Sequence, residues 1–343
     1  NIPLWRKVFT LDRVSKEIGE ALPVIDATIQ IIDNAASVSS TVPKEEEKFT
    51  IVDLASGRGY LGMLLSEILP PEKVSKIILV DKAWPMCNTK PLPHHMNWDH
   101  IYGTIPTTAH TIEHEEEDEN KDESSPLPLQ NQTYFATWPI PLHTSKQDLK
   151  QSCNQRQLKR VLFDRTKGPI LILGIHLCGT LSLKAIDLFN NFEDNVSFLA
   201  LKPCCLPPML HAKRDEFFSI GQHTFDSKEV CAVGRFKGNR WYGPPRWHLE
   251  EKFNVWVDHL LRGIDVVEND REEEEEVKEE ENHVLQLEEV DGSIDSEKVQ
   301  YCRPGKKKKF GVNVQVKGGF QNAYIFAERN PLTKSLWVDG EEK

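Results

Sequence analysis

The fold is decided by residues 49–81, which read FTIVDLASGRGYLGMLLSEILPPEKVSKIILVD. The apolar run over 49–54 predicts a buried strand that ends at a glycine-rich turn. Apolar residues three and four apart over 59–69 predict a helix with one buried face. The run over 76–80 predicts a second buried strand, which is closed by Asp81. Strand, turn, helix and strand in this order form a βαβ unit, which requires a parallel sheet and a right-handed crossover.

Further buried strands are predicted along the chain, at 169–175 (PILILGI) and 196–201 (VSFLAL), with a helix over 180–190 between them. The third strand of the sheet has two candidates, 99–105 and 134–142. These strands alternate with helices, which is typical of an α/β fold.

The last predicted strands, 312–316 and 323–327, flank Gly318-Gly319 and indicate a closing hairpin. Five strands with βα spacing followed by this hairpin predict a Rossmann-like α/β fold. Its sheet is expected to be seven-stranded and mostly parallel, with an antiparallel last strand. The hairpin favours a methyltransferase topology over a dehydrogenase topology.

Helical periodicity predicts one or two helices over 8–36, interrupted near Pro23, and further helices over 145–163 and 249–264. The predicted organisation is an N-terminal helical segment with a linker, 1–48, followed by one domain over 49–343. Three insertions are expected in that domain: acidic, disordered ones over 106–133 and 268–299, and a basic, aromatic one over 206–248.

The turn from Asp53 to Gly59 predicts a site for a nucleoside cofactor. Without a Cβ, Gly57 and Gly59 let the backbone turn sharply and approach a ligand, and the start of the following helix suits a carboxylate. Asp53 can accept a hydrogen bond from an amino group of the cofactor, and Asp81 can accept both ribose hydroxyls. The predicted cofactor-binding residues are Asp53, Ala55, Gly57, Gly59, Tyr60, Asp81, Lys82 and His176.

The acid before the turn selects between cofactors. Asp53 lies four residues before Gly57, which favours S-adenosylmethionine. The sequence GRGYLG over 57–62 also matches the G-x-G-x-x-G pattern of dinucleotide folds, so NAD or FAD is the second candidate. A tight turn that binds no ligand is the third interpretation.

Polar residues lie at the ends of the predicted strands 169–175 and 196–201, the fourth and fifth in chain order. This is the edge where ligands bind in open α/β sheets. These polar residues are His176, Cys178, Lys202, Cys204 and Cys205. Our prediction is an acceptor pocket without a metal: His176 and Lys202 are catalytic, orienting or deprotonating the nucleophile, and the three cysteines contact the substrate. Two alternatives stay open. His176 and the three cysteines form a metal site, although two of these cysteines are adjacent and no C-x-x-C motif is present; or the cysteines are buried packing residues.

Charge is distributed unevenly along the chain, whose net charge is −11. The runs 113–123 and 268–297 have net charges of −7 and −13, so the rest of the chain has a net charge of +9. A basic body suits a polyanion such as RNA, and ordinary surface charge explains it equally well. The segment 206–248 mixes cations with aromatic residues as nucleic-acid sites do, and its Arg240 and Trp241 are predicted to bind substrate. A folded insertion with a small local core is the alternative.

Composition and segment lengths exclude some classes of protein. No apolar run reaches the roughly 18 residues of a membrane span, and no signal segment is visible. The seven cysteines in this long chain indicate reduced thiols, as in a cytoplasmic or nuclear protein. The basic tetrad Lys306 to Lys309 is expected on the surface, where it can touch phosphate or act as a weak nuclear signal. The oligomeric state is not predicted.

Three motifs together carry a family resemblance. They are IVDLASGRGYL over 51–61, His-Leu-Cys-Gly over 176–179 and Pro-Cys-Cys over 203–205. In these the chain resembles the class I methyltransferase family that includes the eukaryotic tRNA acceptor-stem 2′-O-methyltransferases. That family tends to carry Cys-Cys-His-His where this chain has Cys-Cys-Leu-Pro over 204–207. The resemblance implies a Rossmann-like fold with S-adenosylmethionine as cofactor.

The leading hypothesis is an enzyme that transfers a methyl group from S-adenosylmethionine to RNA, with tRNA as the candidate named by the resemblance. A protein or a small molecule is the alternative acceptor. Two further hypotheses are a non-catalytic module that binds the cofactor and an NAD-linked Rossmann enzyme.

Overall fold

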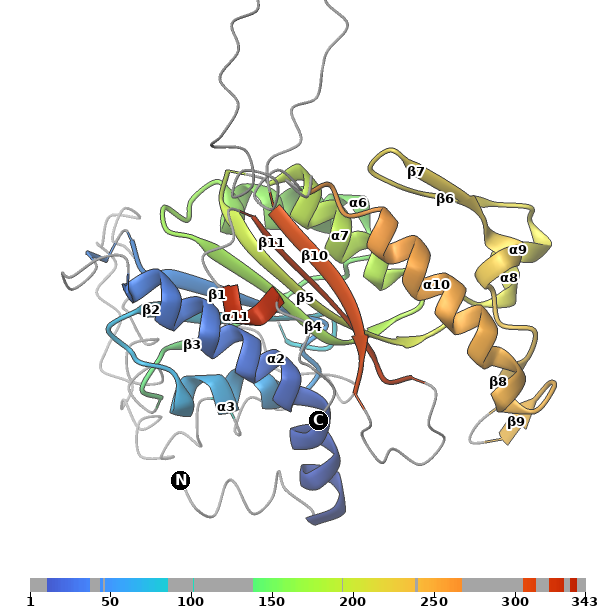
Figure 1. Ribbon diagram of the computed structural model, residues 1–343, viewed down its shortest axis with the longest axis horizontal. Helices are drawn as coiled ribbons and strands as arrows, with labels where there is room; N and C mark the ends of the chain where they lie inside the picture. Colours follow the sequence, from blue (N-terminus) through green and yellow to red (C-terminus); the bar gives the residue numbers. More distant parts are fainter. Residues whose placement is uncertain are drawn as a thin grey trace, which may run out of the picture.

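The protein is built on one seven-stranded sheet with the strand order β10-β11-β5-β4-β1-β2-β3 (Figure 1). The structure is a computed structural model that describes residues 11–37, 44–45, 47–85, 101, 138–192, 194–237, 240–266, 305–312, 321–329 and 334–337. The strands are β1 (Phe49–Leu54), β2 (Val74–Asp81), β3 (Leu142–Lys146), β4 (Ile170–Cys178), β5 (Val196–Cys205), β10 (Gly305–Gly311) and β11 (Ala323–Arg329). Strands β1 to β5 are parallel, and β11 is antiparallel to both β5 and β10. The predicted Rossmann-like sheet with an antiparallel last strand is confirmed.

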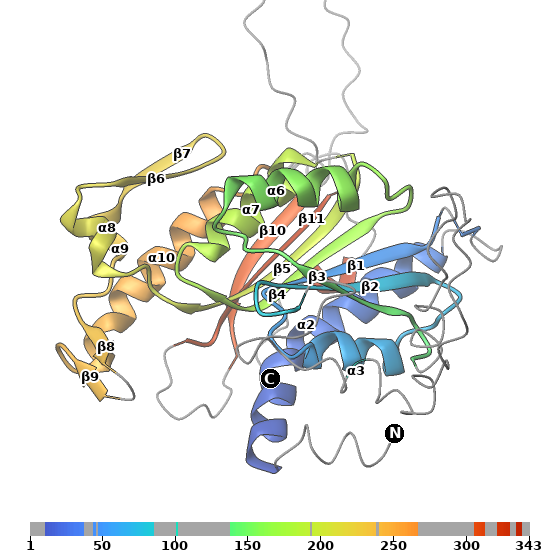
Figure 2. The same ribbon diagram turned by 180° about the vertical axis from the view of Figure 1, so that it is seen from behind.

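Helices cover both faces of this sheet (Figures 1 and 2). Helices α2 (Leu11–Ser37), α3 (Tyr60–Ile68) and α11 (Lys334–Trp337) lie on one face. The other face carries α6 (Ser152–Leu158), the π-helical turn Lys159–Phe163, α7 (Leu181–Asn191) and α10 (Glu250–Arg262). None of the helices described is long and apolar enough to cross a membrane.

The core is split into two apolar layers by the sheet. Because side chains alternate along a strand, Ile51 packs in the layer under α2 and α3, and Val52 packs in the layer under α7 and α10. All six residues of β1 are buried, as expected for a central parallel strand covered on both faces. This buried strand fixes the place of the glycine-rich turn at its end.

Helix α2 runs without interruption through Pro23, so the predicted break there is wrong. A proline inside a helix costs about 3 kcal/mol because a hydrogen bond is lost and the ring is crowded. Val24 and Ala27 next to it are completely or almost completely buried against the sheet layer. Burial of one face of the helix, from Ala21 to Ile32, outweighs the local cost of the proline.

The third strand is β3, and neither candidate segment supplies it. The segment 134–142 meets β3 only at Leu142, and Ile101 is the only described residue of 99–105. Strand β3 reads LHTSK and pairs with β2 alone, at the edge of the sheet. Because β3 occupies 142–146, the helix predicted over 145–163 begins only at Ser152.

The closing hairpin is shifted toward the N-terminus relative to its prediction. Strand β10 is formed by Gly305–Gly311, and only Val312 of the predicted strand 312–316 lies among the described residues. The basic tetrad is therefore part of the sheet. Lys307 Nζ donates to the Ile264 carbonyl over 2.7 Å, Lys308 Nζ donates to the Leu336 carbonyl, and Lys309 pairs with Asp258.

The insertion 206–248 is folded, while the described residues do not include 106–133 or 268–299. Phe218 and Phe225 of the insertion are buried in the layer under α7 and α10, so part of it serves as local core. Its elements are α8 (Met209–Lys213), β6 (Phe217–Ile220), β7 (His223–Asp226), α9 (Ser227–Val230), β8 (Arg235–Lys237), β9 (Arg240–Tyr242) and the 3₁₀ turn Arg246–Leu249.

Candidate functional site

The turn after β1 has an unusual backbone. Ala55, Gly57 and Gly59 all adopt positive φ angles, of 53°, 53° and 79°. The turn is closed by a hydrogen bond from the Gly59 N–H to the Ser56 carbonyl, over 2.8 Å. A Cβ on Gly59 would lie 2.7 Å from Leu79 Cδ1, so a side chain there would disturb the neighbouring strand β2. Left-handed backbone at a non-glycine residue such as Ala55 is strained and is concentrated at functional sites.

Asp81 at the end of β2 holds this turn in place. Its Oδ2 accepts a hydrogen bond from the Gly57 N–H over 3.1 Å, and its Oδ1 accepts one from the Ala83 N–H over 2.8 Å. Each carboxylate oxygen has a second lone pair with which it can accept a ligand hydroxyl. The predicted pairing of the first turn with the acid that closes the second strand is therefore present.

A cavity of about 330 Å³, including the space at its mouth, opens beside the turn. The strands contribute the end of β1 and of β4, and α2 and α3 supply the remaining walls. The lining residues are Glu17, Ala21, Asp53, Ala55, Ser56, Tyr60, Leu61, Ile175 and His176.

Asp53 is the chemically distinctive residue of the cavity. It is only 3% exposed, and its Oδ2 accepts no hydrogen bond within the described structure. Burial, and secondarily the nearby Asp81 carboxylate, raise the pKa of Asp53 well above its ordinary value. A buried polar atom without a partner is rare and costly. A ligand that donates a hydrogen bond or carries positive charge would satisfy it.

Helix α2 meets the sheet through a buried polar cluster. Glu20 Oε1 lies 3.3 Å from Lys202 Nζ on β5, and both side chains are almost fully buried. His176 Nε2 on β4 lies 3.2 Å from Glu17 Oε2 and 3.5 Å from Glu20 Oε2. The Glu20 carbonyl also accepts a hydrogen bond from the Tyr324 hydroxyl of β11, over 2.9 Å. We call Glu17, Glu20, His176, Lys202 and Tyr324 the α2 anchor.

The predicted cofactor residues divide into three groups. Asp53, Ala55, Tyr60 and His176 line the cavity, whereas Gly57, Gly59 and Asp81 shape the turn beside it. Lys82 is exposed on the turn that follows β2 and is not among the lining residues. Its predicted contact with the cofactor stays a prediction.

The predicted catalytic residues differ in accessibility. The His176 side chain is 39% exposed and lines the cavity, whereas Lys202 is 2% exposed and is paired with Glu20. The ion pair gives Lys202 a structural role, and its catalytic role stays a prediction. Glu17 and Glu20 were not among the predicted site residues, although a glutamate within the apolar face that contains Ala21 and Val24 was a visible signal.

The predicted substrate residues lie in two places. Cys178, Cys204 and Cys205 come together at the ends of β4 and β5, and His176 is not part of their cluster. Arg240 and Trp241 lie on β9, which with β8 forms a separate two-stranded ribbon. In Figures 1 and 2 this ribbon lies beyond the ends of β4 and β5, next to the start of α10 and apart from α2 and α3.

The strand order, the antiparallel β11 and the acid-flanked glycine turn define a class I methyltransferase. The chain matches the family described as "Methyltransferase domain" over residues 22–211, more than half of its length, and belongs to that family. It is therefore a methyltransferase that uses S-adenosylmethionine as the methyl donor. No curated protein matches the chain.

The residues of the cavity fit this donor. Asp53 offers an unpartnered buried carboxylate to an amino group, and Asp81 offers lone pairs to ribose hydroxyls. No side chain caps the start of α3, where Gly59 is the capping residue, so the helix dipole is suited to a carboxylate. When bound, S-adenosylmethionine supplies a methyl group on a positively charged sulfur.

Proposed function

We propose that the acceptor of the methyl group is an RNA, with tRNA as the first candidate. The support comes from the distribution of charge. Outside its two acidic runs the chain has a net charge of +9, which suits a polyanionic substrate. The resemblance of the three motifs to the tRNA acceptor-stem family adds the tRNA candidate.

The observation that carries the proposal is an exposed cation–aromatic pair on the β8–β9 ribbon. The Arg240 guanidinium carbon lies 5.4 Å from the centre of the Tyr242 ring, and the Tyr242 side chain is 47% exposed. Tyrosine rings stack on unpaired bases, and arginine contacts phosphate or stacks on bases. The ribbon lies beyond the ends of β4 and β5 (Figure 1).

Methyl transfer requires three contributions from the protein. The protein must align the acceptor atom with the methyl group, exclude water and remove a proton. His176 is the residue best placed for the last task, because it lines the cavity and its Nε2 is held 3.2 Å from Glu17. Glu17 can orient the imidazole.

A transfer assay with tritium-labelled S-adenosylmethionine tests the proposal on the full chain. Total RNA, purified tRNA, protein extract and a metabolite fraction are offered separately. We expect label in RNA that is lost after ribonuclease treatment. Label in the protein or metabolite fraction alone overturns the RNA proposal but keeps the methyltransferase. Binding of S-adenosylhomocysteine without transfer to either RNA fraction also overturns the RNA proposal.

A matched pair of variants locates the RNA surface. The double variant Arg240→Ala/Tyr242→Ala should raise KM for RNA by about 10–100-fold, because one stacking contact is worth about 1–3 kcal/mol. The control Lys73→Ala removes a partly exposed cation that pairs with Asp33 of α2, and should leave KM within about two-fold. Equal KM values for both variants contradict the assignment of the ribbon.

A further inference from the structure

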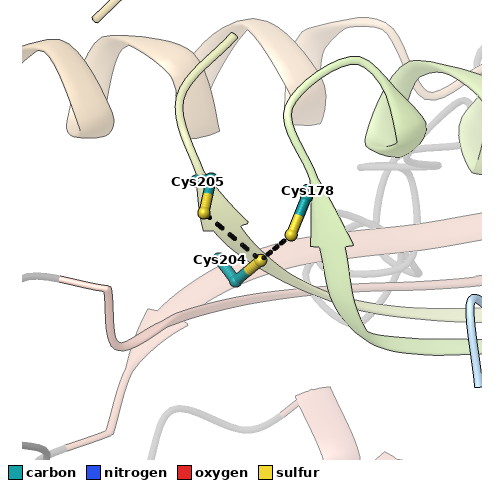
Figure 3. A group of neighbouring side chains, drawn as sticks. All are labelled: Cys178, Cys204 and Cys205. Carbon is teal, nitrogen blue, oxygen red and sulfur yellow. Dashed lines mark hydrogen bonds between the residues drawn. The ribbon is translucent and has the colours of Figure 1, made fainter. Parts of the chain in front are cut away.

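Three cysteine sulfurs meet at the ends of β4 and β5 (Figure 3). Cys178 Sγ lies 2.9 Å from Cys204 Sγ, and Cys204 Sγ lies 3.7 Å from Cys205 Sγ. All three sulfurs lie within 4.8 Å of one another. The sulfur of Cys204 lies between the other two, which point toward it from the two strand ends. We call these residues the cysteine cluster.

The backbone explains why two adjacent cysteines can both join the cluster. Cys178 and Cys205 are register partners, and the pairing of β4 with β5 is irregular on either side of Leu177. The Gly179 N–H donates to the Cys205 carbonyl over 3.2 Å, and Gly179 has a φ of 56°. The chain therefore leaves regular strand geometry here, and the alternation that would turn Cys204 and Cys205 to opposite faces does not apply.

The cluster is unfavourable for thiolates unless a cation is present. Cys204 Sγ lies 2.9 Å from Cys178 Sγ and 3.7 Å from Cys205 Sγ. Three sulfurs this close repel one another when ionised. A metal ion that replaces their protons removes this repulsion.

The dimensions and the ligand type favour zinc. Zn–S bonds of about 2.3 Å in a tetrahedral site place sulfurs roughly 3.8 Å apart. The distance of 3.7 Å between Cys204 Sγ and Cys205 Sγ already meets this value. The Cys178–Cys204 pair would have to open by about 0.9 Å, which is feasible because Cys178 is exposed at the end of its strand. Binding needs only the release of protons, whereas a disulfide in this cluster needs an external oxidant.

The cluster offers three ligands and one open position. Within the described parts of the chain, no fourth histidine, cysteine or carboxylate joins it. Cys178 and Cys205 are both exposed, so solvent reaches the cluster. Three protein ligands with an accessible fourth position are the arrangement of reactive zinc sites rather than closed structural ones. Cys178 lies two residues after His176, which lines the cavity beside the glycine-rich turn. We call this cavity the donor cavity.

We propose that Cys178, Cys204 and Cys205 bind one zinc ion at the edge of the donor cavity, with a fourth coordination position open to an exchangeable ligand. The site revises the sequence prediction of an acceptor pocket without a metal, and it omits the His176 of the four-residue alternative. The proposal does not depend on whether the acceptor is RNA.

Metal binding by the purified, reduced full chain tests the proposal with zinc and cobalt ions alone. We expect one zinc per chain by elemental analysis, and cobalt spectra with sulfur-to-metal charge-transfer bands. Zinc should protect three thiols from a thiol reagent. The variants Cys178→Ser and Cys205→Ser, both at exposed positions, should lower zinc affinity by more than about 100-fold, because even indirect partners of a metal site contribute 10–100-fold.

The control is Cys153→Ser, which removes an exposed cysteine outside the cluster and should leave zinc affinity unchanged. Binding of S-adenosylhomocysteine by each variant verifies that it is folded. Three results overturn the proposal: no zinc bound by the reduced chain, equal zinc affinity in the wild type and both cluster variants, or no protection of thiols by zinc. A disulfide between Cys178 and Cys204 that forms in place of zinc binding identifies a redox pair instead.

Discussion

Two buried carboxylates, Glu20 on α2 and Asp53 on β1, differ in whether an ion pair holds them. Glu20 on α2 is paired with Lys202 and lies near His176. Asp53 on β1 has an oxygen with no partner, and its pKa is raised. A paired buried charge fixes the position of a helix, whereas an unpaired one lowers stability unless a ligand satisfies it. The comparison indicates that Glu20 holds α2 in position, whereas Asp53 is available to bind the cofactor.

The largest expected effect is a loss of stability when the ion pair between Glu20 and Lys202 is broken. Glu20→Gln leaves the Lys202 ammonium buried without a counter-ion and should lower the free energy of unfolding by about 3–5 kcal/mol. Urea denaturation measures this loss. The double variant Glu20→Gln/Lys202→Met removes the unpaired charge and should recover most of it. Glu17→Gln is the control, because its partner His176 is partly exposed, and it should change stability by less than about 1 kcal/mol.

At the unpaired carboxylate, the variant Asp53→Asn should change the stability of the fold and the affinity for the cofactor in opposite directions. The affinity for S-adenosylhomocysteine should fall by about 10–100-fold, because a charge-assisted hydrogen bond is lost. The free energy of unfolding should rise by about 1–3 kcal/mol at pH values above the raised pKa of Asp53, because a buried unpaired charge is removed there. Calorimetry and urea denaturation measure the two changes. Asp81→Asn is the control and should lower stability, since both oxygens of Asp81 accept backbone hydrogen bonds. A loss of stability in Asp53→Asn contradicts the comparison.

The same variant has a defined pH dependence. Because the folded pKa of Asp53 is raised, the folded chain binds more protons than the unfolded chain between the ordinary carboxyl pKa of about 4 and the raised value. Stability of the wild type therefore falls as pH rises through this window. The advantage of Asp53→Asn should be largest above the window and should vanish toward pH 4.

Smaller effects are expected within the turn itself. Gly57→Ala should cost about 1 kcal/mol, because a Cβ is unfavourable at positive φ and nothing lies within 4 Å of it. Gly59→Ala should cost about 2–3 kcal/mol, because its Cβ also contacts Leu79. Denaturation of both variants measures the difference. Equal losses indicate that Leu79 moves aside freely.

The smallest effect is expected at Ala55. Ala55→Gly relieves a left-handed conformation and should raise the free energy of unfolding by about 0.5–1 kcal/mol. Cofactor affinity should stay within about four-fold, because Ala55 presents only one methyl group to the cavity and a buried methyl group contributes about 0.8 kcal/mol. A destabilised variant would show that the methyl group of Ala55 packs in the core, where it contacts the layer under α7 and α10.

Sequence reasoning predicted the parts of the fold with strong periodicity. Strands β1, β2, β4 and β5 are apolar because both faces of the sheet are covered. The edge strands β3 and β10 were not predicted, because they lack the continuous apolar runs of the central strands. Strand β3 has one neighbour and reads LHTSK, and β10 reads GKKKKFG, so neither has an apolar run. Lysines are common on edge strands because they discourage pairing with other chains.

The site was predictable where it depends on local backbone. The turn and the acid of β2 follow from spacing, because glycines and strand ends mark them in sequence. The α2 anchor was not predictable, because Glu17 and Glu20 reach His176 across 159 and 156 positions. The cysteine cluster required the irregular register around Leu177, which regular strand geometry does not indicate.

The Tyr324–Glu20 hydrogen bond joins residues 304 positions apart. Strand β11 is added between β5 and β10 only after nearly all of the sheet has been synthesised. A chain emerging from the ribosome can form β1, β2 and the glycine turn early, but α2 gains its contact with Tyr324 only when β11 arrives. Competence to hold the methyl donor is thereby coupled to the synthesis of β11, and a nascent chain that stalls before β11 is expected to leave α2 loosely held and open to proteolysis.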